Sequence, residues 1–80
     1  MTVLQFARSC AQHPAGSCRL ADLLTIYRRQ AGARRITRAQ AIAELSGHYQ
    51  LVVANRALVV VGILAPGRAV VDHGRLRVVA

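Results

Sequence analysis

The pattern of apolar residues changes at Tyr49, and this change constrains the fold more than any other feature of the chain. Before Tyr49, apolar residues recur three and four positions apart, as in amphipathic helices. After it, β-branched residues dominate in short runs separated by turn residues, as in strands and hairpins. A chain of 80 residues is long enough for one compact core. The sequence therefore predicts a single α+β domain over residues 1–80, with three short helices followed by a small antiparallel sheet.

Capping boxes and chain breakers set the boundaries of the predicted helices. Thr2 with Gln5, and Thr37 with Gln40, have the spacing at which two side chains satisfy the backbone N–H groups of a helix start. Proline and glycine residues would end the helices. The predicted helices cover about residues 3–12, 20–30 and 38–46.

The apolar spacing also assigns a buried face to the helices. In the second helix, the predicted inner face comprises Leu20, Leu23, Leu24 and Tyr27. In the third helix, it comprises Ala39, Ile42, Leu45 and Ser46, and the predicted outer face comprises Gln40, Ala41, Ala43 and Glu44.

Two hairpins are predicted after Tyr49. In the first, strands over residues 50–53 and 58–64 flank a turn at Ala54-Asn55-Arg56. In the second, strands over residues 68–71 and 76–79 flank Asp72-His73-Gly74. Ser17-Cys18-Arg19, before the second helix, also suits a short strand.

One face of the second hairpin would be apolar, formed by Ala69, Val71, Leu76 and Val78. If this hairpin lies at the edge of the sheet, its unpaired backbone could pair with a second copy of the chain. A homodimer is therefore one predicted outcome.

The charge is strongly positive and consists of arginine. The chain has eleven arginines, no lysine and three acidic residues, which gives a formal charge of +8 at pH 7. A GC-rich genome would explain arginine in place of lysine, but it would not explain the excess of cations over acids. Guanidinium groups fit phosphate oxygens with two parallel hydrogen bonds. The composition therefore predicts an acidic partner, either nucleic acid or a protein that handles it.

Several other classes of protein are disfavoured. Aromatic residues are too few for a module that stacks single-stranded bases. No apolar run is long enough for a membrane span, and polar residues with Arg8 near the N-terminus do not suit a signal peptide, so a cytoplasmic protein without a membrane partner is expected.

No cofactor, metal or enzymatic activity is expected. Cys10, His13 and Cys18, even with His48 or His73, lack the two tight ligand pairs of a structural zinc site, so the cysteines are predicted to be core residues. The three acids, which are Asp22, Glu44 and Asp72, lie on unrelated elements and predict no catalytic carboxylate pair.

Residues 17–63 resemble the winged helix-turn-helix module at the C-terminal end of phage and mobile-element primase-helicases. The likeness lies in Leu23-Leu24-x-x-Tyr27-Arg28, in Ile36-Thr37-Arg38-Ala39-Gln40 after a basic connection, in Asn55-Arg56 at the hairpin tip, and in Val61-Gly62-Ile63. The chain departs from the family at Gln30, where a tryptophan is usual, and in its second hairpin.

The resemblance implies that the helix opened at Thr37 enters a major groove. Arg38 would then reach a phosphate or a guanine, Gln40 an adenine, and Arg56 a neighbouring phosphate. The alternatives are that the loop and hairpin arginines are only solvated charges and that Gln40 is only a capping partner. Glu44 would oppose phosphate, and Tyr27 is expected in the core. The candidate binding residues are Arg28, Arg29, Arg34, Arg35, Thr37, Arg38, Gln40, Asn55 and Arg56.

Three functions remain open at this point. The leading hypothesis is a regulatory protein of a phage or mobile element that binds double-stranded DNA. The second is a small inhibitor of a host nucleic-acid machine, such as an anti-CRISPR protein that blocks a CRISPR effector, with an acidic protein or ribonucleoprotein complex as its partner. The third is an assembly protein that dimerises through its C-terminal strands.

Overall fold

A strand lies between the first two helices, and the two hairpins follow the third helix. The computed structural model describes residues 1–66, 69–72 and 75–78, the last two ranges by their backbone alone. The elements in this part of the chain are α1 (Val3–Ser9), β1 (Gln12–Arg19), α2 (Leu20–Arg28), α3 (Arg38–Ser46), β2 (Gln50–Ala54), β3 (Ala57–Ile63), β4 (Ala69–Asp72) and β5 (Arg75–Val78). The predicted α+β class is confirmed.

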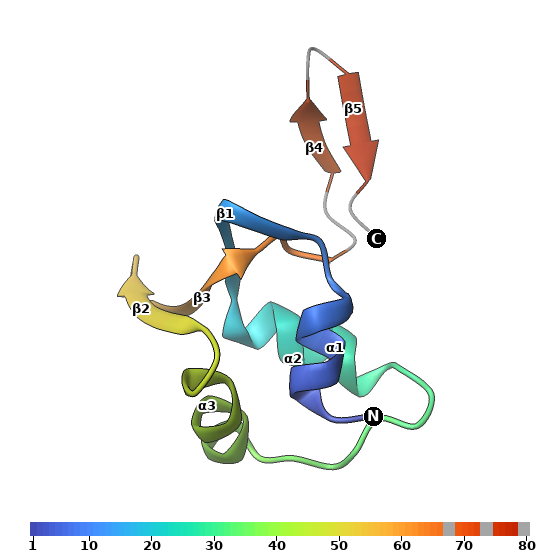
Figure 1. Ribbon diagram of the computed structural model, residues 1–80, viewed down its shortest axis with the longest axis vertical. Coiled ribbons are helices and arrows are strands. Elements are labelled where there is room, and N and C mark those ends of the chain that lie inside the picture. The colour runs from blue at the N-terminus through green and yellow to red at the C-terminus, as the bar shows by residue number, and fades with distance from the viewer. Residues whose placement is uncertain (67–68, 73–74, 79–80) are drawn as a thin grey trace.

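Strand β3 lies at the centre of a three-stranded antiparallel sheet whose order is β1-β3-β2. Cys18 of β1 and Leu51 of β2 are both register partners of Val60. The three helices lie on one side of this sheet, below it in Figure 1. Strands β4 and β5 form a separate two-stranded sheet that projects from the other end of the molecule.

The first helix is shorter than predicted, and a strand that includes Pro14 and Gly16 takes its place. Helix α1 ends at Ser9, where the backbone becomes extended at Cys10 and the Gln12 side chain donates to the carbonyls of Ala7 (2.7 Å) and Cys10 (3.0 Å). Strand β1 then runs from Gln12 to Arg19 with an irregularity between Gln12 and Ser17. It tolerates Pro14 because it is an edge strand. The predicted strand at residues 17–19 was therefore correct but too short.

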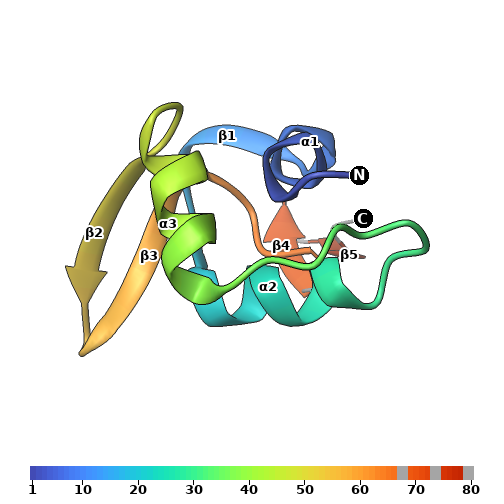
Figure 2. The ribbon, with the colours of Figure 1, turned by 90° about the horizontal axis from the view of Figure 1, so that it is seen from below.

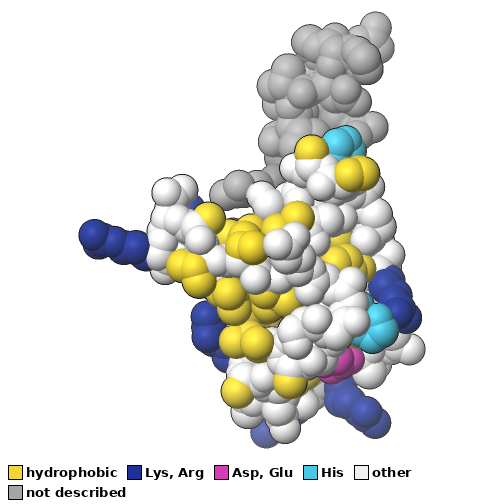
Figure 3. Space-filling model, turned by 60° about the vertical axis from the view of Figure 1, so that its left-hand side comes forward, with side chains coloured by type: hydrophobic (Ala, Val, Ile, Leu, Met, Phe, Trp, Pro, Cys, Tyr) yellow, Lys and Arg dark blue, Asp and Glu magenta, His cyan; other side chains and the backbone are white. Residues whose placement is uncertain are grey.

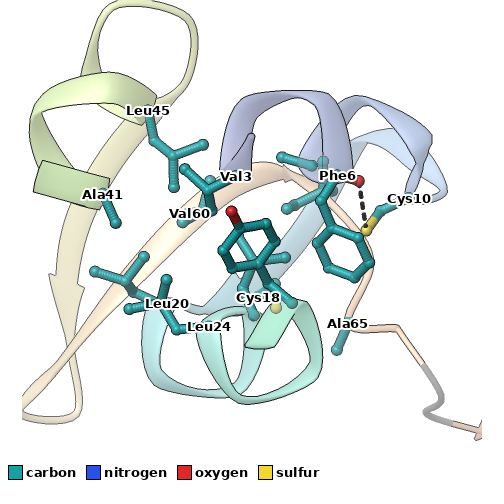
Figure 4. Close-up of a cluster of buried hydrophobic side chains, with 14 residues drawn as sticks. Val3, Phe6, Cys10, Cys18, Leu20, Leu24, Ala41, Leu45, Val60 and Ala65 are labelled. Carbon is teal, nitrogen blue, oxygen red and sulfur yellow. Dashed lines mark hydrogen bonds between the residues drawn. The ribbon is translucent and has the colours of Figure 1, made fainter. Parts of the chain in front are cut away.

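Among the residues whose burial the structure describes, fourteen apolar residues form one core cluster, and α2 supplies four of them. These four are the predicted inner face of the second helix, Leu20, Leu23, Leu24 and Tyr27, which is thus confirmed. Phe6 of α1 also joins the core, with its ring centroid 5.8 Å from that of Tyr27. Figure 4 shows the side chains converging from the helices and from β3.

The predicted inner face of the third helix was wrong in part. Ala41 and Leu45 are fully buried, whereas Ala39 and Ser46 are exposed and Ile42 is half-buried. Positions 41 and 45 lie one turn apart, so they share a face. The small Ala41 side chain lets α3 approach its neighbours closely, and Figure 4 shows it directed toward the core.

The first hairpin is confirmed, and its turn is tighter than predicted. Ala54 pairs with Ala57, and only Asn55 and Arg56 connect them, with φ angles of 50° and 62°. Two consecutive residues in the left-handed region are the signature of a type I′ turn, which suits the twist of a hairpin.

Positive φ also occurs within β3, at Gly62. Its φ is +105°, although a Cβ there would meet only Tyr49 Cδ1, at 3.8 Å. The glycine is therefore required by backbone conformation and not by space. We expect Gly62→Ala to lower the free energy of unfolding by about 1–3 kcal/mol, measured by urea denaturation.

Gly47→Ala is the matched control for this change. Gly47 has a φ of −73°, and the nearest atom to an added Cβ lies 3.9 Å away. This variant is expected to be as stable as the unchanged protein, or about 0.5 kcal/mol more stable. If Gly62→Ala were as stable as Gly47→Ala, this would contradict the account, because it would show that a side chain at position 62 causes no backbone strain.

The second hairpin is confirmed, although Asp72, which was predicted in the turn, is the last residue of β4 and pairs with Arg75. Ala69 is the partner of Val78 and Val71 is the partner of Leu76, so these four residues share one face. Strand β5 begins at Arg75, one residue before the predicted start. The predicted strand ends at Arg68 and Val79, and the predicted turn residues His73 and Gly74, lie outside the described residues. The homodimer remains a prediction.

Candidate nucleic-acid interface

The arginine run lies on a continuous surface made by the end of α2, the following loop and the start of α3. Arg28 ends α2, Arg34 and Arg35 lie in the loop, and Arg38 is the first residue of α3. Each of these side chains is exposed, as is that of Arg29. Figure 2 shows the loop passing close to the N-terminus before it enters α3. We call the segment from Arg28 to Arg38 the basic loop.

The backbone of the basic loop is held by the buried side chain of Tyr27. The Tyr27 hydroxyl lies 2.6 Å from the carbonyl oxygen of Arg34 and 2.9 Å from that of Met1, and its single proton serves these two acceptors. The Arg34 N–H donates to the same Met1 oxygen at 2.9 Å. Tyr27 is fully buried, so the prediction that it is a core residue is confirmed. The loop arginines therefore extend into solvent from an anchored backbone.

Five of the nine predicted site residues line one open pocket of about 530 Å³. Ala33 and Ile36 complete its lining, and Arg28 Nη2 donates to the Ile36 carbonyl at 3.4 Å. The five predicted residues are Arg28, Arg34, Arg35, Thr37 and Gln40. The structure does not place Arg29 or Arg38 in the pocket wall, although both lie beside it in the chain.

The start of α3 has the predicted capping box. The Gln40 N–H donates to Thr37 Oγ1 at 3.2 Å, and the Thr37 N–H donates to Gln40 Oε1 at 2.9 Å. A bidentate contact with adenine would need the same amide oxygen of Gln40. The capping role is thus established, and it restricts the adenine contact that the resemblance implies.

The exposed face of α3 carries little information for reading bases. Ala39 and Ala43 are exposed on it, together with Gln40, whose amide oxygen is engaged in the capping box. Glu44, which was predicted to face outward, is half-buried. Small side chains allow close approach to a groove, but they offer no hydrogen bonds to base edges.

Asn55 and Arg56 are at the tip of the β2–β3 hairpin, on a different element from the basic loop. Both side chains are exposed. Asparagine adopts the left-handed conformation at Asn55 readily, but arginine at a φ of 62° is unfavourable by about 1–2 kcal/mol, and glycine would be preferred. The tip therefore bears a positive charge at a cost to stability.

We expect Arg56→Gly to raise the free energy of unfolding by about 1 kcal/mol, because Asn-Gly is the favoured type I′ pair. Thermal or urea denaturation would measure it. Arg56→Ala is the control, because it removes the same charge and keeps the Cβ that causes the strain. A loss of stability in the glycine variant would contradict this account of the turn.

Arg8 makes a contact between distant segments that was not predicted from the sequence. Its Nη2 donates to His48 Nδ1 at 3.2 Å, which links α1 to the residues after α3. The two positions are 40 residues apart, so no local pattern relates them.

On the face shown in Figure 3, arginine side chains project around the margins and hydrophobic side chains gather at mid-height.

Both cysteines lie in the core, as predicted. Cys10 and Cys18 are both buried, and the Cys10 thiol donates to the Phe6 carbonyl at 3.3 Å. Burial raises the pKa of the Cys10 thiol, which keeps it protonated. Among the residues that the structure describes, no three His, Cys, Asp or Glu side chains are grouped to hold a metal ion.

No protein-family model, curated protein or solved structure matches this chain significantly. In the described part of the chain, no helix has the length and apolar character needed to cross a membrane. The function is therefore argued from the site itself.

Proposed function

We propose that this protein binds double-stranded DNA through the basic loop, the start of α3 and the tip of the β2–β3 hairpin, as a cytoplasmic regulator encoded by a phage or mobile element. The observation that carries the proposal is the anchored basic loop, in which a buried tyrosine fixes the backbone beneath exposed arginines. The order α2, α3, hairpin is also the order in the winged helix-turn-helix module that residues 17–63 resemble.

Phosphate contacts would supply most of the affinity. Each guanidinium can donate two parallel hydrogen bonds to phosphate oxygens, and each neutralised phosphate releases bound counterions. An anchored loop loses less conformational freedom on binding than a mobile one. Since the exposed face of α3 is rich in alanine, base reading would be shallow and sequence discrimination weak.

The test is fluorescence anisotropy with a labelled duplex at low salt. We expect Arg56→Gly to bind several-fold more weakly than the unchanged protein while being at least as stable, because one phosphate contact is lost. Arg56→Lys, which retains the charge, should recover much of the affinity. Duplex affinity that is the same for all three proteins would remove the hairpin tip from the interface.

A second candidate is supported by the same alanine-rich face and by the engaged amide of Gln40. A protein that reads bases poorly could instead use its arginines to dock on the acidic surface of a host nucleic-acid machine, as an anti-CRISPR protein would. Capture of a host complex that persists after nuclease treatment, together with weak binding to free duplex, would favour this inhibitor over the DNA-binding protein.

A further inference from the structure

The pocket at the basic loop combines two kinds of surface that a duplex phosphate alone does not need. Its rim carries Arg28, Arg34 and Arg35, and its wall includes the half-buried side chains of Ala33 and Ile36. None of the described residues that line it is acidic. A backbone phosphate would use the rim, but it would leave the apolar wall without a partner.

The shape and charge of the pocket fit a small amphiphilic anion. Its volume of about 530 Å³ lies in the range of small-molecule sites, about 300–1,000 Å³. Guanidinium groups bind phosphates and also stack on planar rings. The positive end of α3 lies at the pocket through Thr37 and Gln40, which adds to the attraction for anions.

We propose that this pocket binds a nucleoside polyphosphate, with the phosphates at the three arginines and the base and ribose against Ala33 and Ile36. Arg28 lines the pocket, and its Nη2 donates to the Ile36 carbonyl at 3.4 Å. The inference goes beyond duplex binding and does not depend on it. Because the ligand would occupy loop arginines, it would compete with DNA wherever duplex binding occurs.

Calorimetric titration of the unchanged protein with ATP and with inorganic tripolyphosphate tests the proposal. Tripolyphosphate carries the greater charge density but has no apolar surface. We expect ATP to bind more tightly, by about tenfold, because burial of the base and ribose adds to the phosphate contacts. Tripolyphosphate that binds as tightly as ATP would overturn the proposal, since it would show a purely electrostatic surface.

Three variants locate the site. Arg28→Ala should weaken ATP binding by about tenfold, whereas Arg19→Ala, which removes the same charge from β1, should leave it nearly unchanged. Ile36→Thr keeps the branch at Cβ but shortens the side chain and makes it polar, so it should weaken ATP binding while leaving tripolyphosphate binding unaltered. Equal losses from Arg28→Ala and Arg19→Ala would overturn the assignment. These titrations contain no DNA, so they can succeed or fail independently of duplex binding.

Discussion

Simultaneous replacement of Arg34, Arg35 and Arg38 by alanine is expected to weaken duplex DNA binding by at least about tenfold. Up to three phosphate contacts would be lost, which would make the dependence of log Kd on log salt shallower by about 2–3. The fold should be nearly unaffected, because exposed charges contribute little to stability and these like charges repel one another. Anisotropy titrations at several salt concentrations would measure both effects.

A charge-matched control separates a site from a general effect of net charge. Replacing Arg68, Arg75 and Arg77 by alanine also removes three charges, from +8 to +5, but from the C-terminal part of the chain. This control should bind duplex DNA more tightly than the basic-loop variant. If the two variants lose the same affinity, the basic loop is no more than solvated charge, and the site assignment fails.

Tyr27→Ala is expected to lower the free energy of unfolding by about 3–5 kcal/mol, measured by urea denaturation. Tyr27 is a fully buried side chain, packs against Phe6, and anchors the Arg34 carbonyl. A domain of this size has a total stability of about 4–12 kcal/mol, so the variant should be close to unfolding.

Tyr27→Phe separates the ring from its hydroxyl. The core would be preserved, but the carbonyls of Arg34 and Met1 would lose their tyrosine donor, at a cost of about 1–3 kcal/mol. We expect this variant to remain folded and to bind duplex DNA more weakly, because the basic loop is less firmly held. Affinity equal to that of the unchanged protein would show that the hydroxyl does not organise the site.

Local patterns were sufficient for the elements whose stability is local. The capping box at Thr37 and Gln40 has the predicted hydrogen bonds, and the buried face of α2 matches its apolar spacing. The hairpin turn at Asn55 and Arg56 was found because β-branched runs flank it. In each case the residues that decide the structure are close neighbours in the sequence.

Strand β1 shows where local patterns fail. Pro14 and Gly16 normally interrupt regular structure, so they predict a loop. In the fold, Pro14 lies on an edge strand, and Gly16 lies where an added Cβ would be 3.1 Å from the backbone of Ile63. The glycine is thus needed for close approach to β3, which is a tertiary requirement.

The candidate site was predicted as a set of charges and not as a shape. The arginine run identified the surface, but the pocket depends on how the loop returns across Tyr27, and no spacing rule describes that path. The burial of Ala41 in place of Ala39 likewise follows from the packing of α3, and the contact of Arg8 with His48 joins distant segments. These features arise from packing between elements.

The salt dependence of duplex binding by the unchanged protein tests the central claim most directly. Contacts from four to six arginines to phosphates predict a slope of about −4 to −5 in a plot of log affinity against log salt. The measurement needs one labelled duplex and a series from about 50 to 300 mM salt, a range over which such an interface should lose orders of magnitude in affinity. Steep weakening with that slope is the expected result. Micromolar or tighter binding that does not change with salt, or no binding at the lowest salt, would contradict the proposal that the arginines bind DNA phosphates.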